Sequence, residues 1–127
     1  LATQMPVIAG LLCFASFASM GLPGLSGFVG EFLSIVGAWA SPAIAPWIVV
    51  VAGLGVLLGA AYILWMLQRV AFGQPSYAIA DHDDATIREV LVVAPLVVLI
   101  VVMGLWWGSL LQFTNPAMQL LAKMVGG

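Results

Sequence analysis

The stretch GLPGLSGFVGEFLSIVG, residues 21–37, decides how this chain folds. It is apolar enough for a lipid bilayer, yet it opens with the Gly-Leu-Pro-Gly of residues 21–24 and carries an acid at Glu31. Proline removes a backbone donor and disfavours helix at the residue before it, while glycine accepts dihedral angles that other residues resist. The stretch therefore predicts an interrupted helix with an ionisable group close to the interruption.

The composition of the chain is that of a membrane protein. Hydrophobic residues make up 64% of the 127 residues and charged residues 6%, and the mean hydropathy is +1.20. A soluble domain has about 45–50% apolar and about 25% charged residues. The net charge of -2 is too small to indicate nucleic acid or anionic lipid as a partner. The single cysteine, Cys13, cannot form a disulfide within the chain, and we interpret it as a buried, inert thiol.

Long intervals between charged residues predict two helices that cross the membrane. Residues 48–67 and residues 90–111 carry no charge, and each run suffices for a hydrocarbon layer about 30 Å thick at about 1.5 Å per residue. We place the spans at about 47–70 and 88–111, the second with Trp106 and Trp107 in an interfacial aromatic belt. A short amphipathic helix on the membrane surface is predicted at about 116–125.

Residues 5–40 do not fit a single continuous helix. Such a helix would be roughly 54 Å long, whereas each half, divided at residues 21–24, is marginal for crossing alone. We predict one discontinuous span over about 5–40, in which the freed backbone groups are buried in protein or line a wet cavity. The predicted fold is thus all-α: an integral membrane protein with one discontinuous transmembrane helix followed by two transmembrane helices. Because the chain starts with Leu1, we expect it to be a piece of a longer protein.

The polar segment between the two later spans sets the predicted topology. Arg69 precedes it and Arg88 follows it, so the positive-inside rule puts this segment in the cytoplasm and residues 41–46 on the other side. Asp84 or Thr86 is predicted to cap the helix that follows. His82 lies among aspartates, but we interpret this as a solvated loop and predict no metal site.

Glu31 is the predicted functional residue. An ionised acid at mid-membrane costs about 3 kcal/mol on insertion scales, so such residues mark pathways or charge pairs. Burial favours the neutral form of a carboxyl group, which lets it take up and release protons. No cation lies within residues 5–40 or within the charge-free runs 48–67 and 90–111 to pair with it. The alternative is that Glu31 only makes a structural hydrogen bond, or that it lies near the membrane interface.

Helical spacing places small residues beside Glu31. Gly27, Ser34 and Ala38 share its face, with Gly24 close to the same line, and this face is thin and polar enough to admit another helix or water. The residues on the other faces suit lipid or apolar helix contacts, namely Phe28, Phe32, Leu33 and Val36.

A second group of small residues lies further along the chain. Gly55 and Gly59, with Ala52, form a stripe that we interpret as general helix packing. Tyr62 and Gln68 have the chemistry to donate to a water chain, but we favour a packed hydroxyl and an amide at headgroup level.

Three segments resemble the M-subunit family of respiratory complex I, the NADH-quinone oxidoreductase. They are MPVIAGLLCFASFASMGLPGLSGFVGEFLSIVGAW at 5–39, YILWMLQRVAFG at 62–73 and IREVLVVAPLVVLIVVMGLWW at 87–107. The resemblance covers nearly the whole chain and weakens around Asp81 and beyond Leu111. It implies the C-terminal part of an antiporter-like membrane subunit, with the subunit's discontinuous helix and its last two helices.

The resemblance also implies an activity, namely proton translocation coupled to electron transfer from NADH to quinone. Glu31 would be the residue that transfers protons, and the break that supports it would consist of Gly21, Pro23, Gly24 and Gly27. Paralogous subunits usually carry lysine at this position, so Gly30-Glu31-Phe32 favours the M subunit. The alternatives are a segment of a multisubunit cation/proton antiporter and a purely structural membrane scaffold.

The expected cofactors and partners follow from the same resemblance. We expect no cofactor in this chain, because it has no dinucleotide-binding glycine loop and one cysteine cannot ligate an iron–sulfur cluster. NADH, FMN, the iron–sulfur clusters and quinone would be bound by other subunits. The expected partners are the other membrane-arm subunits of complex I and membrane lipid. The expected location is the inner (plasma) membrane of a bacterium, with the mitochondrial inner membrane as second choice.

Overall fold

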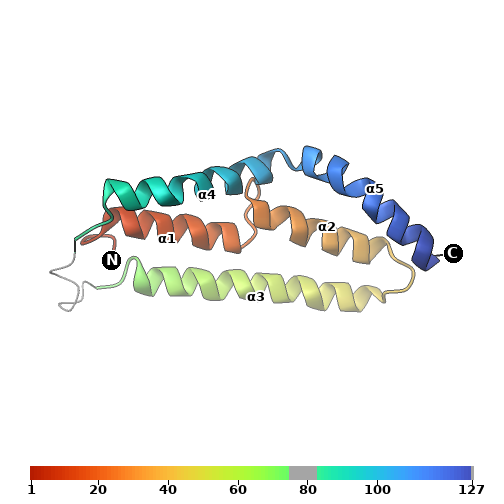
Figure 1. The fold of residues 1–127 in the computed structure, drawn as a ribbon. Coiled ribbons are helices and arrows are strands. Elements are labelled where there is room, and N and C mark those ends of the chain that lie inside the picture. The colour runs from red at the N-terminus through yellow and green to blue at the C-terminus, as the bar shows by residue number, and fades with distance from the viewer. Residues whose placement is uncertain (75–82, 127) are drawn as a thin grey trace.

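The computed structural model describes residues 1–74 and 83–126, and its regular structure in these ranges is helical. The helices are α1 (Pro6–Ser19), α2 (Ser26–Ala40), α3 (Pro46–Val70), α4 (Ile87–Leu105) and α5 (Trp107–Gly126). Figure 1 shows α1 and α2 end to end, α3 running back along both, and α4 followed by α5 on the other side. The predicted all-α class is confirmed. His82 and Asp81, for which a solvated loop was predicted, lie outside the described residues.

Two of these helices meet the requirements for crossing a membrane. The most apolar windows of α3 and α4 have a mean hydropathy of 2.4, and only 6% of each window is buried inside the chain. The helices α1 and α2 are apolar but have only 14 and 15 residues. At about 1.5 Å per residue each is about 21–23 Å long, too short for a layer about 30 Å thick. They lie end to end, as the discontinuous span predicted over about 5–40 requires, and that span stays a prediction.

Local sequence explains where several helices begin. Proline occupies the first turn of α1 and of α3, where its missing N–H has no helical partner to lose. A capping box opens α4: Thr86 Oγ1 accepts from the Glu89 N–H at 3.4 Å, and the Glu89 carboxylate accepts from the Thr86 N–H at 2.8 Å. Of the two predicted capping residues, Thr86 is the one that caps α4.

Asp84 caps a different helix, which lies far away in the sequence. Its carboxylate accepts hydrogen bonds from the backbone N–H groups of Val7, at 2.8 Å, and Ile8, at 3.1 Å, in the first turn of α1. Desolvation raises the pKa of Asp84, but hydrogen bonds from the N–H groups of Val7, Ala85 and Ile8 outweigh it and hold the pKa below its ordinary value of 3.8. The segment that leads into α4 is therefore tied to the positive end of α1.

The end of the chain differs from the prediction. The span predicted at 88–111 is shorter, because α4 ends at Leu105 and Trp106 leaves the helix with φ -107° and ψ 37°. The helix predicted at 116–125 is part of the longer α5, which begins at Trp107. Gly104 and Gly108 flank the interruption, and glycine is a weak helix former. The position of α5 on a membrane surface stays a prediction.

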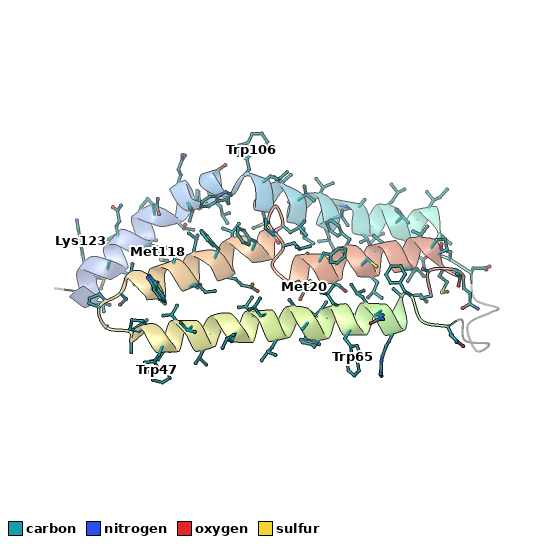
Figure 2. The ribbon with its side chains drawn as sticks, turned by 180° about the vertical axis from the view of Figure 1, so that it is seen from behind. Met20, Trp47, Trp65, Trp106, Met118 and Lys123 are labelled. Carbon is teal, nitrogen blue, oxygen red and sulfur yellow. The ribbon has the colours of Figure 1, made fainter. Side chains whose placement is uncertain are left out.

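The buried core of the described chain is small. Its buried residues belong mainly to α1, α3 and their flanks, namely Met5, Ala9, Ser16, Val49, Ile63, Leu67 and Ala71, and Gly104 of α4 is buried as well. Large apolar side chains remain exposed, and Figure 2 shows Trp47, Trp65 and Trp106 projecting outward from the bundle. Cys13 is half-buried, not buried as predicted. So much apolar surface on a small core is suited to lipid or to neighbouring protein.

Candidate functional site at the helix break

The break between α1 and α2 depends on two glycines. Gly21 has φ +70° and Gly24 has φ +94°, in the region where residues with a side chain pay about 1–2 kcal/mol. Pro23 lies between them and has no N–H to continue a helical ladder. The interruption predicted at residues 21–24 is confirmed, since α1 ends at Ser19 and α2 begins at Ser26.

The carboxyl group of Glu31 lies against this break. A Cβ atom built on Gly21 would stand 2.5 Å from Glu31 Oε2 and 3.1 Å from Glu31 Cδ, so a side chain at this position would displace the carboxyl group. Side chains of a helix lean toward its N-terminus, which explains why Glu31 reaches back from the second turn of α2. The residue is half-buried. The structure thus brings together the acid and the broken backbone that the sequence placed ten residues apart.

Two further glycines allow backbones to meet at the break. A Cβ atom on Gly27 would collide with the carbonyl oxygen of Ala18, in the last turn of α1. A Cβ atom on Gly104 would collide with the carbonyl group of Gly24, so α4 covers one side of the break by direct backbone contact. Gly27 was predicted as part of the site. Gly104 was missed, because a glycine near a helix end carries no sign of what packs on it.

Two adjoining hollows lie between the break and α3. The first, of about 380 Å³, is lined by Glu31, by Ser19 and Met20 at the end of α1, and by one side of α3 that includes Tyr62. The helices α1 and α2, which lie end to end, are called the broken pair below. Figure 2 shows Met20 between the broken pair and α3. The second hollow, of about 520 Å³, follows α2 and is lined by Ser26, Gly27, Gly30, Glu31, Ser34, Ile35, Ala52 and Val56. The two hollows adjoin, since Glu31, Ala52 and Val56 line both of them.

The two faces predicted for α2 are largely confirmed. Gly27 and Ser34 line the second hollow together with Glu31, whereas Ala38 is not among its lining residues. On the other face Phe28 and Phe32 stack with their ring centroids 5.2 Å apart. These two rings and Leu33 line a separate hollow of about 270 Å³ against the end of α4 and Trp107 of α5. This face therefore makes the apolar helix contact that was predicted as one of its two uses.

The small residues of α3 face open space within the described chain. A Cβ atom on Gly55 or on Gly59 would meet nothing within 4 Å, so within the described chain these glycines do not bring two helices into close contact. They line the first hollow, opposite Glu31. Tyr62, predicted as a packed hydroxyl, is 63% exposed and lines the same hollow. The packing interpretation of these residues stays a prediction, because spacing alone does not say which helix a small face meets.

Comparison with known proteins gives the class of this chain. Residues 1–59 match the family model described as "NADH:quinone oxidoreductase/Mrp antiporter, TM", and this match contains the broken pair, the break and the first part of α3. The chain belongs to this family of antiporter-like membrane subunits.

Within the family, the relatives in question are M subunits. The chain is 36% identical to NADH-quinone oxidoreductase subunit M of Rhodobacter capsulatus over 97% of its length, and 40% identical to that of Rickettsia bellii over 96%. It is 40% identical over 84% of its length to NADH-ubiquinone oxidoreductase chain 4 of Marchantia polymorpha. The chain spans about a quarter of the length of these curated relatives, between 21% and 24%. These similarities favour the subunit M assignment over a stand-alone antiporter.

Proposed function

We propose that this chain is part of a membrane-arm subunit of NADH-quinone oxidoreductase and that it carries protons across the membrane, coupled to electron transfer from NADH to quinone. Glu31 is the group that takes up and releases the proton. One observation carries the proposal: the Glu31 carboxyl group lies against Gly21 at an interrupted helix, in a chain whose relatives are named subunit M.

The surroundings of Glu31 suit a group that exchanges protons. Its half-buried carboxyl group points toward the N-terminal end of α2 and lies against the break. Irregular backbone at the break supplies polar groups that a continuous helix would use in its own hydrogen bonds, as in transporters with broken helices.

The remainder of the machinery would lie in other subunits. They would hold NADH, FMN, the iron–sulfur clusters and quinone, while the exposed apolar faces of α3 and α4 would contact membrane-arm subunits and lipid. The proposed location is the plasma membrane of a bacterium. The end of α3 supports a membrane interface before the cytoplasmic segment, because the Arg69 guanidinium lies 4.1 Å from the centre of the Trp65 ring, and both residue types are common at that level.

The test replaces Glu31 by Gln and by Ala in the full-length parent protein, within the assembled complex in membrane vesicles. Proton pumping per NADH oxidised is expected to fall in both variants, because neither side chain can carry the proton. Glu89→Gln is the matched control, since it makes the same chemical change outside the site and glutamine still serves a capping box. Normal pumping in both Glu31 variants would remove this residue from the mechanism and favour a structural scaffold.

A cation/proton antiporter is the second candidate, because the description of the matched family names both classes. The two are separated by the parent protein alone, reconstituted without any NADH-oxidising partner. Sodium transport by that preparation would favour the antiporter, and its absence together with NADH-driven pumping in the complex would support the main proposal.

A further inference from the structure

The irregular backbone between α1 and α2 contains a tight turn over residues 22–25. The Leu25 N–H donates to the Leu22 carbonyl oxygen at 3.1 Å, and Gly24, the third of the four residues, has φ +94°. Proline as the second residue and glycine at positive φ as the third are characteristic of a type II β-turn. Pro23 also fixes its own φ, which limits how the turn can deform. The 22–25 turn therefore responds to a push as a unit.

The end of α4 lies directly on this turn, and Figure 1 shows the backbone of the break reaching the end of α4. A Cβ atom on Gly104 would stand 2.5 Å from the carbonyl carbons of both Gly24 and Leu25. Gly104 is buried, whereas the rest of α4 is half-buried or exposed. The contact is thus made between backbones, and it leaves no room for a methyl group.

The 22–25 turn is joined to the helix that carries the acid. Leu25 is the N-cap residue of α2, and its carbonyl oxygen accepts from the Phe28 N–H at 3.2 Å. Glu31 follows in the second turn of the same helix, and its carboxyl group lies against Gly21, on the α1 side of the 22–25 turn. A displacement of the turn would therefore move the start of α2 relative to Gly21, and with it the carboxyl group.

The helix α4 is attached to the broken pair at its other end as well. Asp84, just before α4, accepts hydrogen bonds from the N–H groups of Val7 and Ile8 in the first turn of α1. Because α4 is attached near both of its ends, it cannot simply withdraw when a side chain is added at Gly104. The 22–25 turn has to move instead.

We propose that Gly104 is a positioning residue for Glu31: by lying against the 22–25 turn, it sets where the carboxyl group sits relative to the break. The inference rests on the proposed function, in which Glu31 takes up and releases the proton, and it adds a residue from a helix that does not carry the acid. Gly104 acts through the turn and not on the proton itself. Such an effect is large enough to measure, since misplacing a reacting group by about 1 Å can lower a rate about 100-fold.

The first measurement follows the Glu31 carboxyl group directly, in the complex assembled with the full-length parent protein. Membranes are treated with dicyclohexylcarbodiimide, an apolar reagent for carboxylic acids, and modification of Glu31 is followed over time by mass spectrometry, with Glu31→Gln as the background. Gly104→Ala should change the rate of modification severalfold, because the methyl group displaces the turn. Gly108→Ala, the same change with nothing within 4 Å of its Cβ atom, should react at the wild-type rate. An unchanged rate in Gly104→Ala would overturn the positioning role, even if less complex assembled.

The second measurement is proton pumping per NADH oxidised, in a double-mutant cycle. With Glu31 present, Gly104→Ala should lower pumping relative to Gly108→Ala, and by no more than Glu31→Gln does. In the Glu31→Gln background it should have no further effect. An equal loss in both backgrounds would show that Gly104 supports something other than the acid, and would overturn the proposal.

Leu105→Ala decides the question if Gly104→Ala does not assemble. The Leu105 Cδ2 atom lies 3.7 Å from where a Cβ atom on Gly24 would stand, so its loss loosens the same contact without a collision. A smaller change in the modification rate of Glu31 is expected, and an unchanged rate would again overturn the positioning role.

The positioning role and the proposed function fail separately. A changed modification rate in Gly104→Ala, combined with normal pumping in Glu31→Gln, would keep the effect of Gly104 on the carboxyl group and reject the proton-carrying role. An unchanged modification rate, combined with lost pumping in Glu31→Gln, would keep the proton-carrying role and reject Gly104 as its positioning residue.

Discussion

The chain interrupts its helices twice, and the two interruptions are built differently. Between α1 and α2 the backbone leaves the helix over residues 20–25, with positive φ at Gly21 and Gly24. Between α4 and α5 a single residue, Trp106, departs from helical geometry at negative φ. The first interruption contains a proline, which disrupts a helix, between two glycines at positive φ. The second has only two weak helix formers beside it.

The two interruptions are in contact, and the first one positions the second. Gly104, two residues before Trp106, contacts the Gly24 carbonyl group and so fixes the end of α4 on the first break. Beyond that contact the chain changes direction, and Figure 1 shows α5 leaving at an angle to α4. We infer that the first break is an intrinsic structure, whereas the second follows from how α4 is held. The expected effects of mutation therefore differ sharply between the two regions.

The largest effect is expected for Gly104→Val. Its side chain would collide with the Gly24 carbonyl group, which cannot move without distorting the break. Overpacking of this kind costs about 1–3 kcal/mol and sometimes more, and a backbone obstacle places it at the upper end. The measurement is the temperature at which the subunit dissociates from the solubilised complex. Gly108→Ala is the control, since its Cβ atom meets nothing within 4 Å; equal losses in both variants would contradict the backbone contact.

Gly21→Ala comes next and should affect pumping as well as stability. An L-residue at φ +70° costs about 1–2 kcal/mol, and the new Cβ atom would displace the Glu31 carboxyl group. Proton pumping per NADH oxidised should fall in assembled complexes, whereas Gly37→Ala, with open space around its Cβ atom, should leave it unchanged. If Gly21→Ala assembled and pumped normally, the packing of the acid on the break would have no functional meaning.

A smaller, local effect is expected for Asp84→Asn at the start of α1. The folded chain lowers the pKa of Asp84, so the ionised form stabilises this contact above the ordinary value of 3.8, and the contribution is lost as the pH falls below it. Hydrogen exchange at the amides of Val7 and Ile8 should be less protected in the variant at neutral pH. In the wild type the same protection should fall on acidification. Asp83→Asn, an exposed neighbour, should change neither.

The smallest effect is expected for Trp106→Ala. The side chain is 74% exposed, and surface substitutions of this kind usually change stability by about 0.5 kcal/mol or less. If Gly104 decides where α4 stops, the boundary of protected amides between α4 and α5 should stay in place, although alanine is a much better helix former. A continuous helix through residue 106 in this variant would show instead that the tryptophan causes the second interruption.

Parts of the site were predictable from residue types alone. Glycine and proline at 21–24 predicted the break, and the spacing from Gly27 to Ser34 predicted a face of small residues beside Glu31. The contact between Glu31 and Gly21 follows from the general lean of helical side chains toward the N-terminus, but its closeness does not. Asp84 shows the limit clearly. Its residue type predicted a cap, yet the helix that it caps is α1, where it accepts a hydrogen bond from Val7, 77 residues earlier in the sequence.

The sequence by itself determined a membrane protein made of helices, an interruption at residues 21–24 and an acid on the helix that follows it, because composition and backbone freedom are properties of the residues themselves. Only the tertiary structure decided that Gly104 packs against the break and that Asp84, just before α4, accepts hydrogen bonds from the first turn of α1. It also decided that Gly55 and Gly59 line a hollow opposite Glu31. The physical reason is that contacts between distant segments depend on how helices lie against one another. Apolar periodicity says that a face will be covered, but not by which atoms.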